Sequence, residues 1–386
     1  MNDKPRRIAV NVGSGFVPGM NAVAKGLSLA AAELGWEVVG IRNGFAGLLD
    51  PDDYPDGGLL TVSPRFVENL DPAASVGVLG QSPQFDPFHR RQVDEDGMIA
   101  EVDRSDEVLA ALQERGIDAL VSVVGGRGLT ILHKLHRKGL NTVAIPRSLE
   151  NDIAVTMVSF GFNSALSFTI EMLDRAREAA RSSRQIGVVE VQGEQAGWLA
   201  LQAGIAAGAD VILIPELAAD IDAVADYLRG KMSVARPFGL VVVAEGVELE
   251  EASAGGDKPS PMHASLSPLA GGEVTGHAIQ KSGRAAKILA NQLQLKLAER
   301  AHPAVVGAWA RGGRPTAVDR QLGIAYGAGA IRALDAGEEG VMVAFQPPDI
   351  AFVPLLEAIN KVRTVPADSE MMLIARTLGI CLGGAQ

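Results

Sequence analysis

The sequence predicts an α/β protein built from two doubly wound, three-layer lobes of Rossmann-like architecture. Short apolar runs rich in Val, Ile and Ala alternate with segments of helical period, and most runs end in a turn that contains glycine. This alternation is typical of parallel sheets that helices cover on both faces. With 386 residues, 47% of them hydrophobic, the chain exceeds the usual size of one compact domain and can fill two cores.

The apolar runs and the periodic segments give the expected order of elements. Strands are predicted at 7–12, 37–41, 119–124, 142–145, 186–191, 211–214, 240–244, 305–308 and 341–345. Helices are predicted at 20–34, 106–115, 130–138, 163–182, 198–206, 220–231, 274–300 and 317–334. Two further segments are predicted to be surface loops: 50–58, which holds four aspartates, and 248–272, which is dense in Ser, Gly and Pro.

The charge balance argues against two classes of partner. The chain has 35 Lys and Arg residues against 46 Asp and Glu residues, for a net charge of -11. A surface of this sign has no general attraction for nucleic acid or for an anionic membrane. We therefore expect neither as a partner, and an anionic ligand would have to be held by a local arrangement of cations and backbone N–H groups.

The single cysteine and the lengths of the apolar runs indicate the cellular compartment in which the protein is expected. Cys381 alone cannot form an intrachain disulfide. The apolar run after the first residues is too short for a signal peptide, and no apolar stretch reaches the roughly 18 residues of a membrane helix. We expect a cytoplasmic protein.

The first predicted strand ends in a glycine-rich turn, Gly13 to Gly19, which leads directly into a helix. Ligands of parallel sheets gather at the carboxyl ends of strands, where helix N-termini present unpaired N–H groups. Glycine lets backbone amides approach a phosphate closely. Ser14 and Gly15 are therefore candidate phosphate-binding residues, although a purely structural tight turn explains the same pattern.

An ordered set of motifs extends over nearly the whole chain. The motifs are Pro18-Gly19-Met20-Asn21-Ala22, Gly125-Gly126-x-Gly128, Glu150-Asn151-Asp152-Ile153, Gly161-Phe162-Asn163-Ser164-Ala165, Val188-Val189-Glu190-Val191, Ala196-Gly197-Trp198, Ile214-Pro215-Glu216 and Arg311-Gly312-Gly313-x-Pro315, followed by Asp319-Arg320. In this order they resemble the phosphofructokinase family. Within that family, Arg147, the helix at Trp198 and the segment 241–246 look most like the branch that includes pyrophosphate-using and mixed bacterial enzymes.

The resemblance implies a phosphofructokinase-type fold and reaction. The family moves a phosphoryl group from ATP or pyrophosphate to the 1-hydroxyl of fructose 6-phosphate. A donor lobe would comprise 1–160 with 310–360, and a sugar-phosphate lobe 161–309 with 361–386. The expected partners are a small phosphorylated metabolite and further copies of the chain in a dimer or tetramer; an active relative, with this chain as its regulatory partner, is an alternative.

The resemblance also implies that the metal and donor positions have changed. The family carries an acidic magnesium ligand where this chain has Arg127, and usually an Asp where it has Phe16. A guanidinium supplies no oxygen ligand, so ordinary Mg²⁺ binding is doubtful. Arg127 either contacts phosphate itself or faces solvent in a relic loop. The donor phosphates would lie against Gly125, Gly126, Gly128 and Arg147.

Glu150 stands where the family places the carboxylate that takes the proton from the acceptor hydroxyl, one methylene longer than the family's Asp. Asp152 matches the second acid of that motif. It is predicted to orient the loop or, as the one possible metal ligand, a metal ion; capping of the next segment explains it equally well.

The substrate positions show the largest change. The family's Met-Gly-Arg turn is Gln192-Gly193-Glu194 here, which replaces a cation by an anion. Gln185 and His302 stand where the family has Arg residues for the sugar phosphate, and Ala308 replaces a His. The substrate-binding candidates are Ser148, Gln192, Gly193, Glu194, Glu245, His302 and Arg311.

Three hypotheses follow from these replacements. The chain is a divergent phosphotransferase with weak or altered activity, in which Glu150 is the base. Alternatively, it is a catalytically inactive family member that binds a phosphometabolite or regulates an active relative. As a third possibility, Gln192 and Glu194 admit an acceptor that is less anionic, or cationic, because a pocket with different charges selects a different ligand.

Overall fold

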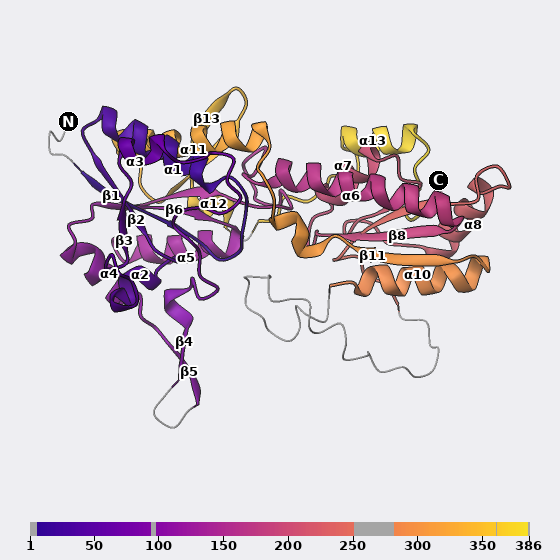
Figure 1. Ribbon diagram of the computed structural model, residues 1–386, viewed down its shortest axis with the longest axis horizontal. Helices are drawn as coiled ribbons and strands as arrows, with labels where there is room; N and C mark the ends of the chain where they lie inside the picture. Colours follow the sequence, from indigo (N-terminus) through magenta and orange to yellow (C-terminus); the bar gives the residue numbers. More distant parts are fainter. Residues whose placement is uncertain (1–5, 94–97, 251–281, 360, 385–386) are drawn as a thin grey trace.

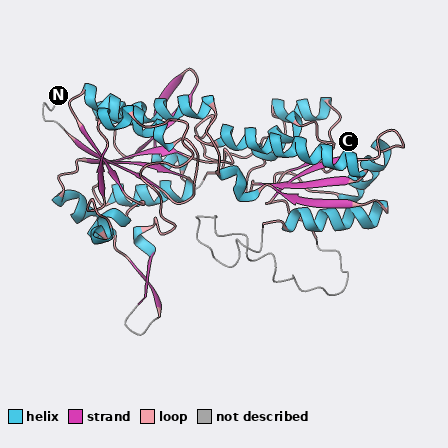
Figure 2. Cartoon of the chain, in the orientation of Figure 1, coloured by secondary structure: helices cyan, strands magenta, loops and turns pink. Residues whose placement is uncertain are grey.

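The protein folds into two α/β lobes that lie side by side (Figure 1). The computed structural model describes residues 6–93, 98–250, 282–359 and 361–384. Each lobe is a sheet between two layers of helices (Figure 2). The predicted fold class is thereby confirmed.

The first lobe is built on a seven-stranded sheet. Its five central strands run parallel, and an antiparallel strand closes each edge. In spatial order the strands are β13 (Asp349–Pro354), β12 (Val341–Gln346), β7 (Thr142–Pro146), β6 (Ala119–Val124), β1 (Arg7–Val12), β2 (Glu37–Ile41) and β3 (Leu59–Thr61).

Helices cover both faces of this sheet, because successive residues of a strand point to opposite sides. Along β1, Ile8, Val10 and Val12 belong to one buried cluster and Ala9 to another. The first face is covered by α1 (Met20–Glu33), α3 (Pro64–Glu68) and α11 (Ala317–Asp335); the second by α2 (Ala46–Leu49), α4 (Ser105–Glu114), α5 (Gly126–Arg137) and α12 (Leu355–Ala358).

The second lobe is built on a four-stranded sheet in which all pairs are parallel. Its order is β11 (Ala301–Val305), β8 (Ile186–Val191), β10 (Gly239–Ala244) and β9 (Val211–Leu213). The described helices of this lobe are α6 (Phe162–Ser183), α7 (Trp198–Ala206), α8 (Ile221–Lys231), α10 (Arg284–Leu297) and α13 (Glu370–Thr377).

One predicted strand is wrong. The run 305–308 was expected to form a strand, but β11 spans Ala301–Val305 and Gly307–Arg311 forms the short 3-10 helix η4. Gly307 has a positive φ of 48°, which ends the extended conformation. The apolar run misleads because β11 is an edge strand whose side chains are largely exposed.

A β-hairpin that the sequence did not predict projects from the first lobe (Figure 1). It consists of β4 (Arg90–Val93) and β5 (Ile99–Val102), and it follows the short 3-10 helix η2 (Pro87–His89). Its base is held by Asp50, which pairs with Arg90 at 2.5 Å and with Arg104 at 2.9 Å. Asp50 begins the predicted acidic loop, which contains the 3-10 helix η1 (Pro51–Asp53).

Two expectations lie partly outside the described residues. The helix predicted at 274–300 is described from Arg284 to Leu297, after Gly283 in a left-handed conformation. The loop predicted at 248–272 is described only to residue 250.

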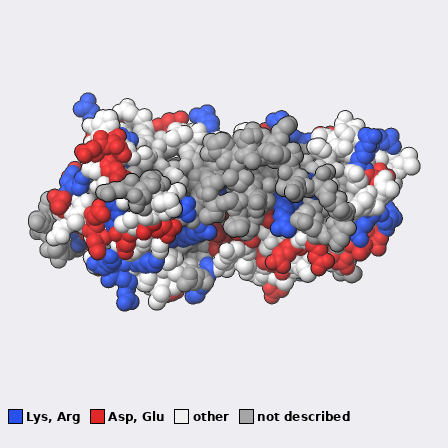
Figure 3. Space-filling model, turned by 90° about the horizontal axis from the view of Figure 1, so that it is seen from below, with Lys and Arg blue, Asp and Glu red and all other residues white. Residues whose placement is uncertain are grey.

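On the face shown in Figure 3, Lys and Arg side chains are interspersed with Asp and Glu. Among the described helices, none combines the length and the apolar character that crossing a membrane requires.

Helices α1 and α11 approach each other so closely that two glycines are required. A Cβ at Gly26 would lie 2.2 Å from the carbonyl oxygen of Ile324, and one at Gly327 would lie 2.4 Å from that of Val23. Both distances are far below van der Waals contact. Helix α1, into which the glycine-rich turn leads, is therefore packed closely against α11.

Asp319 of α11 then connects this helix pair to the second lobe. Its fully buried carboxylate accepts hydrogen bonds from Gly161 N at 2.9 Å, Ser164 N at 2.7 Å and Ser164 Oγ at 2.5 Å. These donors belong to the first turn of α6, whose N–H groups have no partner within the helix. Thr316, the N-cap of α11, adds a 2.8 Å bond to Asn163 Oδ1.

The chain crosses between the lobes more than once. The strands of the first sheet come from 7–146 and 341–354, and those of the second from 186–244 and 301–305. Near the C-terminus, Val365 N donates to Glu216 Oε1 at 2.8 Å, which ties this segment to the second lobe. The lobe boundaries expected from the sequence stay a prediction.

We predict that Asp319→Asn destabilises the protein by about 1 to 3 kcal/mol, because the amide places a donor against buried donors. Urea unfolding at neutral pH measures the change. Asp335→Asn, at the exposed end of the same helix, is the matched control and should change the free energy of unfolding by less than about 0.5 kcal/mol. Equal effects in both variants would contradict the role given to Asp319.

Candidate active site

The two sheets direct strand ends toward one region between the lobes. Glu150 follows β7 of the first sheet, whereas Glu194 and Glu245 follow β8 and β10 of the second. The backbone N–H of Glu194 donates to Glu150 Oε2 at 3.1 Å, so the loops that follow β8 and β7 are in direct contact here. This junction is the candidate active site.

Arg147 holds the glycine-rich turn after β1. Its guanidinium is buried and donates to the carbonyl oxygens of Ser14 and Gly15. Burial, together with the neighbouring Arg311, lowers the pKa of Arg147 to about 9. Arg147 was predicted to face donor phosphates, which stays a prediction; in the structure each of its two terminal nitrogens donates one hydrogen bond to the turn, and the residue also lines the cavity described below.

The loop after β7 is fixed by its own side chains. Ser148 Oγ donates to Asp152 Oδ1 and accepts from Glu150 N at 3.0 Å. Asn151 adopts a positive φ of 56°, and its Oδ1 accepts from Ser159 N at 2.8 Å. Asn is among the few residues that tolerate this conformation. Glu150 is therefore held at a set position between two anchored residues.

Glu150 lies in an environment that favours its protonated form. Burial raises the pKa of Glu150 to about 8, and the nearby carboxylates of Asp152 and Glu245 act in the same direction. The hydrogen bond from Glu194 N and the positive charge of Arg311 act against them. A carboxyl group whose pKa lies near neutrality can accept and return a proton within the working range of an enzyme.

Glu245 and the Gly193-Glu194 turn are packed together. A Cβ at Gly246 would lie 1.9 Å from the carbonyl oxygen of Glu194, so only glycine allows this backbone contact. Burial raises the pKa of Glu245 to about 7, with further contributions from Glu190 and Glu194. Glu190 itself is buried on β8, where it accepts hydrogen bonds from the first turn of α10.

Arg311 is the cation of this cluster. It ends η4, lies electrostatically close to Glu150 and Glu245, and its pKa is lowered by burial. A side chain at Gly15 would begin 3.4 Å from Nη1 of Arg311. Arg311 thus joins the glycine-rich turn to the carboxylates of both lobes.

Gln192 carries an acceptor without a partner. The residue is 7% exposed, and its buried Oε1 accepts no hydrogen bond from the described part of the chain. Buried polar atoms are rarely left in this state, and an orphaned acceptor is a candidate contact for a ligand.

The Gly125-Gly126-x-Gly128 motif forms the start of α5. Gly125 is the N-cap, and Gly128 allows the helix to pack on β6, since a Cβ there would lie 2.5 Å from Val124 Cβ. Gly126 has open space around its Cα. Arg127 is exposed in the first turn. Free N–H groups at a helix start suit an anion, so this end of α5 is compatible with a phosphate.

The magnesium ligand predicted at Asp152 stays a prediction. Within residues 6–93, 98–250, 282–359 and 361–384 no group of three His, Cys, Asp or Glu is placed to hold a metal. Asp152, the possible ligand, bonds to Ser148, and Arg127 offers no oxygen.

His302 is not brought to this cluster. It is exposed on β11 and pairs in register with Gly187 near the amino end of β8, whereas the carboxylates gather at the carboxyl ends. The other substrate-binding candidates lie at the junction. They are Ser148, Gln192, Gly193, Glu194, Glu245 and Arg311.

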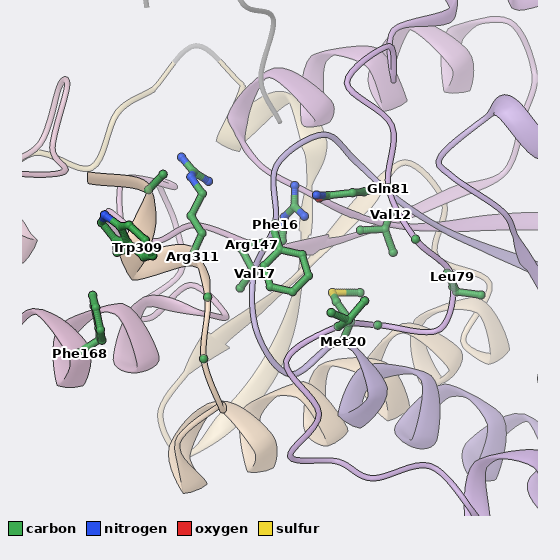
Figure 4. Close-up of a pocket in the computed structure, with 16 residues that line it drawn as sticks. Val12, Phe16, Val17, Met20, Leu79, Gln81, Arg147, Phe168, Trp309 and Arg311 are labelled. Carbon is green, nitrogen blue, oxygen red and sulfur yellow. The ribbon is translucent and has the colours of Figure 1, made fainter. Parts of the chain in front are cut away.

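A cavity of about 680 Å³ opens beside Arg147 and Arg311 (Figure 4). Its walls are largely apolar and include Phe16, Phe168 and Trp309. The sequence analysis did not assign Phe168 or Trp309 to a site. The signal was a Trp two residues before the Arg311-Gly312-Gly313 motif; in the structure it is 70% exposed, which is unusual for so large an apolar ring.

Comparison with known proteins agrees with the motifs. A profile described as phosphofructokinase matches residues 7–334. An ATP-dependent 6-phosphofructokinase of Chloroflexus aurantiacus is 36% identical over 383 residues, which cover 99% of each chain. An ATP-dependent 6-phosphofructokinase 3 of Bacteroides thetaiotaomicron is 30% identical, over 98% of this chain and all of the relative.

A solved structure supports the fold independently. The pyrophosphate-dependent phosphofructokinase from Marinobacter aquaeolei superposes with a TM-score of 0.73, covering 98% of this chain and 92% of that one, at 18% identity. At that identity the likeness establishes the fold only. Because the family profile and full-length relatives agree with it, the chain belongs to the phosphofructokinase family.

Proposed function

We propose that this chain is a phosphotransferase that moves a phosphoryl group from ATP or pyrophosphate to a hydroxyl of fructose 6-phosphate or a related sugar phosphate, with weak or altered activity. Two kinds of relative support the donors: curated relatives are named ATP-dependent, and a structural neighbour is named pyrophosphate-dependent. As in other family members, we expect a homo-oligomer.

In the proposed mechanism the acceptor oxygen attacks the terminal phosphorus of the donor. A new P–O bond forms, the bridging P–O bond breaks, and ADP or phosphate leaves. The hydroxyl proton passes to the carboxylate of Glu150, and Arg311 offsets negative charge at the junction. The N-terminus of α5 and the glycine-rich turn provide N–H groups for the phosphates.

The observation that carries this proposal is the state of Glu150. A carboxylate stands at the strand end, is anchored by Ser148 and by Glu194 N, and has its pKa raised to about 8. If Glu150 had no chemical role, a neutral side chain at this position would make the protein more stable than a buried acid does.

A second candidate function is supported by Arg127. At the start of α5 it places a cation where the family resemblance implies an acidic metal ligand, and no group of three His, Cys, Asp or Glu among the described residues is placed to hold a metal. A catalytically inactive homologue that binds a phosphometabolite, or that regulates an active relative, is the alternative function.

We predict that Glu150→Gln lowers kcat by roughly 100-fold to 1,000-fold, because the amide cannot accept the proton. In the unmodified protein kcat/KM should rise with pH toward a midpoint near 8, since Glu150 must lose its proton to act as a base. Steady-state rates between pH 6 and pH 9.5, with ATP and with pyrophosphate, test both points.

The folding of the variant provides the control. Because the fold raises the pKa of Glu150, the unfolded state loses this proton first, and the stability of the unmodified protein falls as pH rises from about 4.5 through about 8. Glu150→Gln should lack this part of the fall. A folded variant with full activity would rule out Glu150 as the base.

We predict that Arg127→Ala weakens the binding of pyrophosphate by about tenfold or more, if the guanidinium contacts a phosphate. Arg137→Ala, near the other end of α5 and also exposed, is the matched control. Titration calorimetry measures both affinities. Equal affinity in all three proteins would reject a phosphate contact for Arg127.

A further inference from the structure

We propose that Arg363 and Trp198 are positioning residues for the transfer reaction, which hold the loop that carries Glu150 at a set place against the second lobe. This inference rests on the proposed phosphotransferase function and deepens it, because it concerns how the proposed base is aligned with the acceptor side of the site. Neither side chain has a part in the mechanism given above.

The loop of the proposed base pairs with a short segment near the C-terminus. Ile153 and Val362 form an isolated antiparallel bridge. Arg363 N donates to the carbonyl oxygen of Asp152 at 2.7 Å, and Arg363 Nη1 donates to that of Asn151 at 3.3 Å. Arg363 therefore contacts the two residues that directly follow the base, one through its backbone and one through its side chain.

Trp198, the first residue of α7, holds Arg363 from the second lobe. Its Nε1 donates to the carbonyl oxygen of Arg363 at 2.7 Å, and the guanidinium carbon lies 4.1 Å from the centre of the Trp198 ring. A cation over an indole face is attracted by the ring's negative face. Burial lowers the pKa of Arg363, so the fold holds this cation at a desolvation cost that a neutral side chain would avoid.

Glu216 fixes the same segment a second time. Its carboxylate accepts hydrogen bonds from Gly197 N at 3.0 and 3.1 Å, and its Oε1 also accepts from Val365 N at 2.8 Å. Gly197 is the N-cap of α7, and a Cβ there would lie 2.3 Å from Ile214 Cβ. The start of α7 and the segment 362–365 are thus held together as one unit.

The hydrogen bonds within the loop cannot replace this connection. Those between Ser148 and Asp152, and between Asn151 and Ser159, join residues of the segment 148–159 to one another. They set the shape of the loop, but they do not fix its place relative to α7.

The direct contact between the lobes cannot replace it either. The hydrogen bond from Glu194 N ends on the carboxyl group of Glu150 itself. Its strength changes when that group gains or loses a proton, because a charged acceptor binds a donor more strongly than a neutral one. The bonds from Arg363 end on backbone carbonyls, so they persist while the proton is transferred.

Arg363→Ala tests the role of the guanidinium, because it leaves the backbone contacts of residue 363 in place. We expect kcat to fall by about tenfold to 100-fold, since a displacement of about 1 Å within a site has effects of this size. KM for fructose 6-phosphate and for the donor should change by less than about threefold, because the proposed substrate contacts lie on other segments.

Trp198→Phe is the second variant, because it keeps a buried ring and removes only the Nε1 donor. It should lower kcat by about threefold or more. Arg376→Ala is the matched control: it removes an exposed guanidinium of α13, whose Nη1 donates to the carbonyl oxygen of Ala367, and it should leave kcat unaltered. Urea unfolding establishes that each variant is folded.

The midpoint of the Glu150 carboxyl group separates positioning from stability. The variants leave intact the groups that face Glu150, which are Asp152, Glu245, Arg311 and the N–H of Glu194. Since burial is the main cause of the raised pKa, a loosened loop should lower the midpoint in carbon-13 NMR from near 8 toward 4.5. A variant that is only less stable would keep its midpoint while it remains folded.

The outcomes distinguish this inference from the function on which it rests. Unaltered kcat and an unaltered Glu150 midpoint in both Arg363→Ala and Trp198→Phe, or an equal fall of kcat in Arg376→Ala, would overturn the inference and leave the phosphotransferase function standing. An absence of turnover by the unmodified protein with every sugar phosphate and both donors would overturn both.

Discussion

At the contact between the two lobes, the positive charge of Arg311 offsets part of the desolvation cost of the carboxyl groups of Glu150 and Glu245. Each of these groups pays a desolvation penalty, which raises the pKa of both acids and lowers that of the guanidinium. Removing one buried partner would leave the others uncompensated. The arrangement is costly for stability, and such perturbed acids are more typical of chemical sites than of structural ones.

The rest of the fold positions these groups. The close packing of α1 on α11 through Gly26 and Gly327 fixes the glycine-rich turn. Asp319 then transmits the position of α11 to α6 and so to the second sheet. The site contains residues from both lobes. A small change in the contact between α11 and α6 would therefore alter the distance between Glu150 and Glu194, and transfer rates are sensitive to such displacements within an active site.

The sequence predicted the parallel sheets and most of their strands well, because buried parallel strands are continuous apolar runs. It failed at residues 301–305, where an exposed edge strand has no such run, at the antiparallel edge strands β3 and β13 of the first sheet, and at the hairpin formed by β4 and β5. For the site, the motifs placed Glu150, Glu194, Glu245 and Arg311 at strand ends, and these groups meet. Three features of the site depend on packing between distant segments, which local sequence patterns do not encode. They are the hydrogen bonds from Arg147 to the glycine-rich turn, the unpaired oxygen of Gln192 and the cavity beside Trp309.

We infer that the fold keeps Glu150 protonated at neutral pH and that Glu150 becomes a base at slightly higher pH. Carbon-13 NMR of the glutamate side-chain carboxyl carbons tests it directly, with the Glu150 resonance assigned by its absence in a Gln variant. We expect a midpoint near 8 for that resonance. A midpoint close to 4.5, the ordinary value for this side chain, would contradict it.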